Sequence, residues 1–357
     1  MDKTGLRSCP MNVLISGAGV AGVTLAELLT RSGHRGTIVE RAPALRHTGY
    51  AVDFRGAAFD ALSELGILDD VRQHDTKMTG TAVVDRDGVQ VDLLPAEAFA
   101  GELEVPKHVL NELLYGLTVD HVEYRFGTSI ASLSQTEAAV TAELTDGSTE
   151  TYDLVFGADG VYSKVRQLAF APHSAVLQHL GLSGAGFTMP NFLGLDHSGL
   201  LRTSGHTAIY LFNSADADRL TVSLSFGTTS GVLDRLPRVE QESATRAAFA
   251  GDAWHTPRLL EAMSEASDFY FSSSTQVHLN RWSTGRIALV GDAGYCAAPT
   301  AGMGTSQALL GARSLARHLA ASAYPEAFAG YEAELRPYVT ENQANGRSAA
   351  ALFGGRD

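Results

Sequence analysis

A glycine-rich loop set between a short apolar segment and a helical segment constrains this chain more than any other feature of its sequence. Residues 13–16 read Val-Leu-Ile-Ser, and the pattern Gly-x-Gly-x-x-Gly follows directly at residues 17–22. In that pattern the first glycine permits a tight strand-to-helix turn, the second lets backbone approach a pyrophosphate, and the third lets the helix pack on the strand. The N–H groups and the positive dipole end of the helix attract the same pyrophosphate. The loop residues expected to bind a dinucleotide are Gly17, Gly19, Val20, Ala21 and Gly22.

An acidic residue at the end of the next strand narrows the choice of dinucleotide. Residues 37–39 read Thr-Ile-Val, as in a second strand, and Glu40 follows them. Its carboxylate is placed to accept hydrogen bonds from an adenosine ribose and would repel a 2′-phosphate. The site therefore favours NAD or FAD over NADPH, and the alternative is a glycine turn that only joins a strand to a helix.

Composition limits the classes of protein to which the chain can belong. Its 357 residues are 45% hydrophobic, which suffices for a sizeable core and for two domains. The formal charge is −13, with 40 acidic against 27 basic residues and no basic run, so nucleic acid is not an expected partner. No apolar run approaches the roughly 20 residues that span a bilayer, and the N-terminus lacks an apolar signal core, so we expect a cytoplasmic protein without a membrane partner. Cys9 and Cys296 form neither a disulfide framework nor a metal-ligand pair, and no metal site is expected.

The order of the predicted elements indicates an α/β fold. A βαβ unit covers residues 11–40, and turn signals at Asp87-Gly88 and Asp146-Gly147 indicate hairpins. Helical spacing is found at residues 55–74, 106–117, 240–265 (as two helices), 303–320 and from 324 onward. Short segments rich in β formers dominate residues 173–235.

We therefore expect a Rossmann-like dinucleotide-binding domain that is interrupted by a mostly β substrate domain. The first domain, which includes the C-terminal helices, is expected to comprise residues 1–75, 104–172 and 277–357. The substrate domain is expected to comprise residues 76–103 and 173–276.

In two further segments, a predicted strand is followed by glycine and an aspartate. Residues 153–160 read Asp-Leu-Val-Phe-Gly-Ala-Asp-Gly, and Gly291-Asp292-Ala293 follows an apolar strand. An aspartate at the carboxyl end of a parallel strand faces the ligand crevice, where Asp292 can bind a hydroxyl of a ribityl chain. Gly302-Met303-Gly304 opens a helix whose N–H groups can face a reduced flavin, which carries negative charge near N1. Asp159 and Asp292 could each instead cap a turn or a helix.

The three segments together resemble the class A flavoprotein monooxygenases, the family of p-hydroxybenzoate hydroxylase, and its compact members such as the tetracycline-inactivating and polyketide hydroxylases. The resemblance spans residues 11–345 and makes FAD the expected cofactor. By motif position it implies that Glu40 and Arg41 form the acid-arginine pair after the second strand, and that Asp292 holds the ribityl chain. The other residues that it assigns to cofactor binding are Arg46, Asp53, Lys107, Asp159, Gly302, Met303 and Gly304.

Three residues depart from the pattern of this family. Lys107 stands where an arginine is usual, so a point charge replaces a bidentate phosphate contact. Tyr295 stands where histidine is common, and Gly311 replaces a frequent aspartate. The departures at Lys107 and Gly311 leave open a degenerate protein that binds flavin or another ligand without catalysis.

The resemblance also implies a reaction. NADPH or NADH reduces FAD, and O2 then gives a flavin C4a-hydroperoxide that hydroxylates an electron-rich aromatic or polyketide-type small molecule. No side chain is assigned a catalytic role, because the flavin carries the chemistry. An FAD-dependent oxidase, dehydrogenase or ring-forming enzyme is the alternative on the same fold. A halogenase is disfavoured because Trp254 and Trp282 are isolated, and the protein is expected to be a monomer or a homodimer.

Apolar residues of the β segments are the candidates for the substrate pocket. Alternation along a half-buried sheet explains such residues equally well without any ligand. The residues expected to line the pocket are Met189, Tyr210, Phe212, Phe226 and Pro299.

Overall fold

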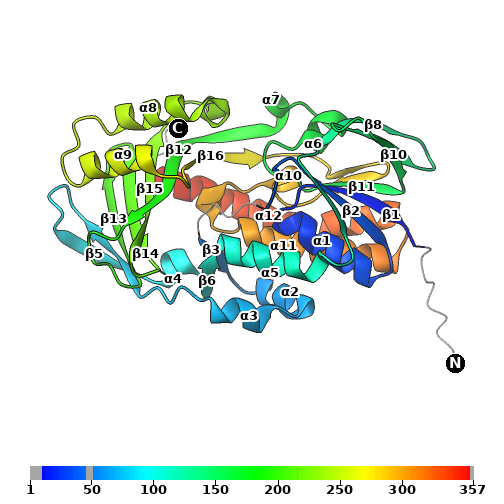
Figure 1. The fold of residues 1–357 in the computed structure, drawn as a ribbon, viewed down its shortest axis with the longest axis horizontal. Helices are drawn as coiled ribbons and strands as arrows, with labels where there is room; N and C mark the ends of the chain where they lie inside the picture. Colours follow the sequence, from blue (N-terminus) through cyan, green and yellow to red (C-terminus); the bar gives the residue numbers. More distant parts are fainter. Residues whose placement is uncertain (1–9, 46–50, 215, 354–357) are drawn as a thin grey trace.

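The computed structural model of the chain describes residues 10–45, 51–214 and 216–353, so Cys9 and Arg46 lie outside the described residues. Figure 1 shows one half built around a six-stranded sheet and another around a seven-stranded sheet, with helix α12 (Tyr324–Leu352) reaching from the first half toward the second. The expected α/β fold, a Rossmann-like half interrupted by a mostly β half, is confirmed.

The six-stranded sheet carries the glycine-rich loop. Its strands follow the order β17-β18-β11-β1-β2-β7, and neighbours pair in parallel except β17, which is antiparallel to β18. The strand bounds are Asn12–Ser16 (β1), Arg35–Glu40 (β2), Glu123–Phe126 (β7), Leu154–Gly157 (β11), Ser283–Thr284 (β17) and Ile287–Leu289 (β18). Residues 13–15 are fully buried, because both faces of this sheet are covered, and they accordingly read as a continuous apolar run.

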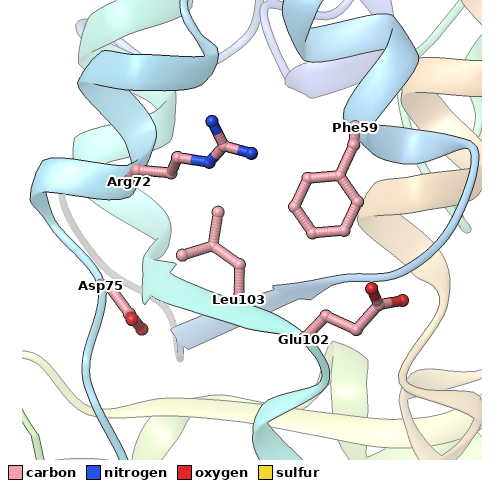
Figure 2. Close-up of a pocket in the computed structure, with 5 residues that line it drawn as sticks. All are labelled: Phe59, Arg72, Asp75, Glu102 and Leu103. Carbon is pink, nitrogen blue, oxygen red and sulfur yellow. The ribbon is translucent and has the colours of Figure 1, made fainter.

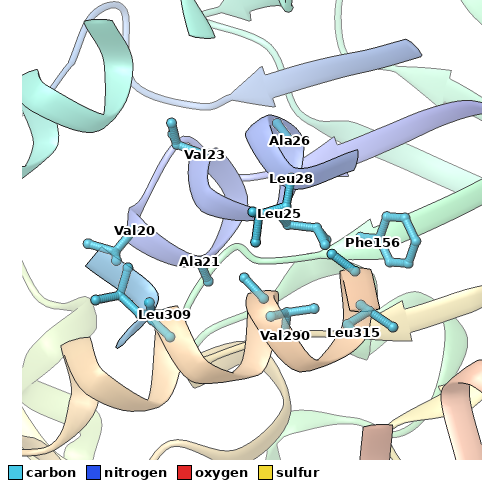
Figure 3. Close-up of a cluster of buried hydrophobic side chains, with 14 of the residues drawn as sticks. Val20, Ala21, Val23, Leu25, Ala26, Leu28, Phe156, Val290, Leu309 and Leu315 are labelled. Carbon is cyan, nitrogen blue, oxygen red and sulfur yellow. The ribbon is translucent and has the colours of Figure 1, made fainter. Parts of the chain in front are cut away.

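Helices cover one face of this sheet and a second small sheet covers the other. The helices are α1 (Val20–Arg31), α5 (Lys107–Thr118) and α11 (Gly304–Ala321). Figure 3 shows α1 and α11 meeting through Val20, Ala21 and Leu309. The opposite face packs on α6 (Lys164–Ala169) and on the antiparallel strands Ile130–Gln135 (β8), Val140–Leu144 (β9) and Thr149–Tyr152 (β10).

The seven-stranded sheet joins two stretches of chain that are far apart in the sequence. Its order is β16-β12-β15-β14-β13-β4-β5, antiparallel except where β4 meets β13. The bounds are Gly80–Val84 (β4), Gln90–Pro95 (β5), Leu177–Pro190 (β12), Ser198–Ser204 (β13), Thr207–Asn213 (β14), Arg219–Gly227 (β15) and Tyr270–Val277 (β16). Helices α8 (Arg238–Ala248) and α9 (Thr256–Glu265) pack on one face of it.

A two-stranded antiparallel ribbon of β3 (Ala51–Phe54) and β6 (Leu103–Pro106) lies between the two halves. The helical spacing over residues 55–74 is confirmed, and it forms two helices, α2 (Ala58–Leu65) and α3 (Leu68–Gln73). Gly66 separates them with a φ of 81°, a left-handed conformation that ends a helix and that glycine adopts without strain. The remaining short elements are α4 (Glu97–Ala100), α7 (His173–Val176), α10 (Asp292–Tyr295) and the 3₁₀ turns η1 (Gly231–Arg235) and η2 (Pro299–Ala301).

Within the described ranges, no helix combines the length and the apolar character needed to cross a membrane.

Candidate functional site

The three glycines of the loop have different surroundings. A Cβ on Gly22 would lie 2.0 Å from the carbonyl oxygen of Gly17, so α1 packs directly on the preceding turn. Gly17 itself has a φ of +107°, and a Cβ there would lie 2.5 Å from the carbonyl oxygen of Ala158. A Cβ on Gly19, by contrast, would meet no atom within 4 Å. The loop therefore leaves room at one glycine, Gly19, at the start of α1, where a pyrophosphate would approach the backbone.

Glu40 lies beside this loop and is bonded to it. Its Oε2 accepts a hydrogen bond from the backbone N–H of Ala18 at 3.0 Å, and its Oε1 accepts one from Ala42 at 2.8 Å. These bonds hold the carboxylate at the carboxyl end of β2, next to the glycine turn. Arg41 follows as an exposed side chain. Ribose binding by Glu40 stays a prediction.

Asp159 caps a helix, the structural role that the sequence allowed as an alternative to cofactor binding. Its Oδ2 accepts hydrogen bonds from the backbone N–H groups of Lys164 (2.8 Å) and Val165 (3.2 Å) and from Ser16 Oγ (3.2 Å). It therefore caps α6 and ties it to β1. Its Oδ1 is buried and has no partner among the described residues, which leaves one oxygen able to accept a bond from a ligand. Cofactor binding by Asp159 stays a prediction.

Arg166 links the second and third motif segments. Its guanidinium is fully buried and donates to the carbonyl oxygens of Ala293 at 2.8 Å and Val161 at 2.6 Å. Burial lowers its pKa to about 10. No local pattern signals this contact, because Arg166 and Ala293 are 127 positions apart in the chain.

Asp292 begins α10 immediately after Gly291, which has a φ of 64°. Burial raises the pKa of its carboxyl group, while a hydrogen bond with Cys296 and the charge of Lys107 act in the opposite direction. Lys107 is the first residue of α5, so its charge and the Asp292 carboxylate act on the same region from two different segments. This arrangement fits a site that holds both a polyhydroxylated chain and a phosphate.

Two of the three departures from the family pattern compensate each other. A Cβ on Gly311 would lie 1.9 Å from the hydroxyl oxygen of Tyr295, so the tyrosine occupies the space that a side chain at position 311 would need. The hydroxyl of Tyr331 is 2.9 Å from that of Tyr295 and 3.0 Å from the carbonyl oxygen of Leu289. All three side chains at positions 282, 295 and 331 are fully buried aromatic rings. Gly311 is thus required by Tyr295, and it is not a sign of a decayed cofactor site.

The segment that follows Asp292 lies against the ribbon. Turn η2 begins at Pro299, which is exposed, and ends at Gly302 with a φ of 66°. A Cβ on Gly302 would lie 3.8 Å from both carboxyl oxygens of Asp53 on β3. Met303 then caps α11, which begins at Gly304. The structure therefore brings Asp53 next to the loop that was expected to border the flavin ring.

Asp53 does not stand alone on the ribbon. It lies directly opposite Glu104 of β6 in the antiparallel register. Asp53 pairs with Arg55 at an Nε–Oδ2 distance of 3.0 Å, and burial raises the pKa of its carboxyl group. Sequence reasoning missed Glu104, because only the pairing of two segments about 50 positions apart places it here, and no local pattern signals that pairing.

The seven-stranded sheet has two chemically different faces. Tyr210 and Phe212 lie on the same face of β14, and their rings stack at 5.0 Å. Phe99 stacks on Tyr210 from the other side at 4.9 Å, and burial together with the charge of Glu104 raises the pKa of the Tyr210 hydroxyl. These contacts place Tyr210 and Phe212 on the face of the sheet that meets α4.

Met189 and Phe226 require a correction. Both are buried in the hydrophobic core between the sheet and α8 and α9, where Phe226 contacts Phe249. The register explains why, since even-numbered residues of β15 share a face with odd-numbered residues of β14, opposite to Tyr210. The expectation that Met189 and Phe226 line the same pocket as Tyr210 is therefore wrong, whereas Tyr210, Phe212 and Pro299 stay predictions.

Two surface pockets lie away from these residues. One, of about 400 Å³, is lined by Phe59, Arg72, Asp75, Glu102 and Leu103, and Figure 2 shows it bounded by α2, α3 and β6. The other, of about 330 Å³, lies between the segment after β16 and the middle of α12 and includes Arg336 and Arg347. No residue expected to bind the cofactor or the substrate lines either one. In the part of the chain that the structure describes, no group of His, Cys, Asp and Glu side chains could hold a metal ion.

Comparison with known proteins agrees with this geometry. The model of the FAD binding domain family matches residues 10–345. A protein of Mycobacterium tuberculosis is 39% identical over 339 residues, which cover 93% of this chain and 91% of the relative. A flavin-dependent monooxygenase of Legionella longbeachae is 35% identical over 342 residues, which cover 94% of this chain and 88% of the relative.

A solved structure resembles the chain over nearly its whole length. The crystal structure of the tetracycline destructase Tet(51) superimposes with a TM-score of 0.87 at 33% sequence identity. The match covers 97% of this chain and 92% of that structure.

Proposed function

Because the chain belongs to the FAD-binding family of flavin-dependent monooxygenases, we propose that it hydroxylates an electron-rich aromatic or polyketide-type small molecule with electrons from NADH or NADPH. The balanced reaction consumes the substrate, O2, NAD(P)H and one proton, and it yields the hydroxylated product, water and NAD(P)+. Bound FAD supplies the transfer of electrons from the nicotinamide and the activation of O2.

One observation carries the proposal. The loop from Pro299 to Gly302 meets Asp53 of the ribbon, which lies directly opposite Glu104. The charge of Glu104 acts on the Tyr210 hydroxyl, and the Tyr210 ring stacks on Phe212. An aromatic substrate held against those rings would therefore lie close to the loop that borders the flavin. Such a site must exclude water for oxygen transfer to succeed, and partly buried rings serve that purpose.

Different residues of this chain would bind different parts of FAD. Gly19 leaves room for the pyrophosphate, and Glu40 would accept hydrogen bonds from the adenosine ribose. Asp292 would accept bonds from the ribityl chain, and Lys107 would add positive charge beside it. Removal of the carboxylate in Asp292→Ala should therefore weaken retention of FAD through dialysis. Unchanged flavin occupancy in this variant would contradict the placement of Asp292.

The decisive experiment measures oxygen transfer. FAD-loaded protein is incubated with NADH or NADPH, ¹⁸O2 and a panel of phenols, polyketides and tetracyclines, the last because a solved relative is a tetracycline destructase. We expect one class of compound to stimulate NAD(P)H oxidation and to acquire one ¹⁸O atom. Stimulated oxidation without label in the product would instead indicate an oxidase, a dehydrogenase or a ring-forming enzyme. No stimulation across the panel would contradict the proposed hydroxylase.

A further inference from the structure

The ribbon carries one carboxyl group that the proposed reaction does not use. Glu104 of β6 lies directly opposite Asp53 of β3, and directly opposed side chains share a face of the ribbon. Asp53 has Arg55 as its counter-charge. Glu104 accepts a hydrogen bond from Thr76 Oγ1 at 2.7 Å, but it forms no ion pair with any residue that the structure describes.

The electrostatic surroundings of Glu104 are unfavourable for a negative charge. Burial raises its pKa to about 7, and the charges of Asp53 and Asp75 add to the rise, while the hydrogen bond from Thr76 opposes it. A partly buried carboxylate without a counter-ion costs stability, and a protein keeps such a group where something else compensates it. No described residue supplies a positive charge at this position.

Next to Glu104 lies a set of aromatic rings, here called the ring stack, formed by Phe99, Tyr210 and Phe212. The Phe99 and Tyr210 rings are 4.9 Å apart at 24°, and the Tyr210 and Phe212 rings are 5.0 Å apart at 23°. Phe99 lies in α4, which leads directly into β6, and the Tyr210 hydroxyl is 3.4 Å from Thr81 Oγ1, in the segment that follows the Thr76 that donates to Glu104. The charge of Glu104 accordingly acts on the Tyr210 hydroxyl. Phe99 and Tyr210 also keep part of their surface exposed.

Arginine side chains that the structure describes lie over other aromatic rings. Elsewhere in the described chain, arginine side chains lie over the rings of Tyr162, Phe192, Trp254, Phe269, Trp282 and Tyr324. None lies over Phe99, Tyr210 or Phe212 among the described residues. Aromatic faces attract cations, and a carboxylate beside them strengthens the attraction.

We infer that Glu104 and the ring stack select substrates that carry a protonated amine, with the ammonium group paired to the carboxylate and the apolar body against the rings. This inference rests on the proposed function, because it names the substrate class of the same site. The ammonium supplies the counter-charge that no described residue gives to Glu104. An anionic substrate would meet repulsion from Glu104, Asp53 and Asp75.

Binding of two matched probes to the FAD-loaded protein tests this selection. Tyramine and 4-ethylphenol share a phenol ring and a two-carbon chain, but only tyramine carries an ammonium group. We expect isothermal titration calorimetry to give about tenfold tighter binding of tyramine, the effect of one favourable charge pair in a partly buried site. In Glu104→Gln, which keeps the size and the hydrogen-bonding capacity, the two probes should bind equally.

Glu102 provides the matched control. It carries the same charge two positions away, but its Oε1 accepts a bond from the backbone N–H of Gly56, and it lines the separate pocket of Figure 2. Glu102→Gln should keep the preference for tyramine. Equal binding of the probes by the native protein, no binding of tyramine up to its solubility limit, or a preference that survives in Glu104→Gln would each overturn the inference.

The outcomes separate this inference from the proposed function. Flavin absorbance and the unfolding midpoint establish whether Glu104→Gln folds, and the comparison of probes on the native protein needs no variant. A preference for tyramine without any ¹⁸O transfer supports the substrate selection and contradicts the hydroxylase. Hydroxylation of neutral phenols without discrimination between the probes supports the hydroxylase and contradicts the substrate selection.

Discussion

The two halves of the molecule use small and aromatic residues in different ways. In the cofactor half, Gly17, Gly22 and Gly311 are each fixed by an atom that a Cβ would strike within 2.5 Å. In the seven-stranded sheet, alternation alone provides two faces, and only the pairing register and the covering helices decide which face becomes core. In the first half Gly17 and Gly22 belong to one local motif that the sequence displays, whereas in the second half the identity of the core face depends on which neighbours the fold supplies.

The largest expected effect tests the tight packing of the glycine loop. Gly22→Ala places a Cβ 2.0 Å from the Gly17 carbonyl oxygen, and the clash cannot be relieved without moving α1 away from β1. We expect a loss of about 4 kcal/mol or more in the free energy of unfolding. Urea denaturation followed by circular dichroism measures it.

Gly19→Ala is the matched control for that variant. The same methyl group enters open space, so the free energy of unfolding should change by less than about 0.5 kcal/mol. FAD affinity should nevertheless fall, because the methyl group occupies the room left for the pyrophosphate. Equal stabilities of Gly22→Ala and Gly19→Ala would contradict the difference in packing between these two positions.

The next effect separates the two faces of the seven-stranded sheet. Phe226→Ala removes a ring from the core beneath α8 and α9 and should cost about 3 kcal/mol, with little change in the KM of a substrate. Phe212→Ala removes a ring from the face of Tyr210 and should cost less stability but raise the KM. Thermal unfolding and steady-state kinetics of the two variants measure both quantities. A larger rise in KM for Phe226→Ala than for Phe212→Ala would instead support the original prediction that Phe226 lines the substrate pocket.

A third prediction concerns Gly311 and Tyr295 in the cofactor half, where the tyrosine fills the space beside the glycine. Gly311→Ala should cost about 2 kcal/mol, because the new Cβ would lie 1.9 Å from the Tyr295 hydroxyl. Adding Tyr295→Phe removes that oxygen, and the nearest ring carbon is then 3.2 Å away. The double variant should therefore be more stable than Gly311→Ala alone in a double-mutant cycle. Additive losses would mean that the two positions are independent.

The sequence predicted most of the cofactor half because its signals are local. The apolar run at 13–16, the glycines at 17–22 and Glu40 lie within one βαβ unit, and each is found where the motif places it. The break at Gly66 was missed because an amphipathic pattern continues on both sides of it. The faces of Met189 and Phe226 were missed because an alternating strand does not reveal which face a helix covers.

Glu104 was missed for a related reason. Three positions separate it from Lys107, yet its environment is created by Asp53 and Tyr210, which come from segments distant in the sequence. Contacts of this kind depend on the register of the ribbon and on how the two halves meet. They can be argued only once the fold is known.

A last expected effect follows from that environment and concerns the dependence of stability on pH. The pKa of Glu104 is about 7 in the folded protein and close to its ordinary value of 4.5 in the unfolded chain. Between these values the folded state holds a proton that the unfolded state lacks, so the free energy of unfolding falls as the pH rises from about 4.5 to about 7. Glu104→Gln cannot lose this proton. From pH 4.5 to pH 8 the stability difference between the two proteins should therefore shift in favour of the variant by about 3 kcal/mol, measured by urea unfolding at matched FAD concentration. A difference between the two proteins that does not change with pH would show that Glu104 is solvated, and the contrast between the paired Asp53 and the unpaired Glu104 would then lose its basis.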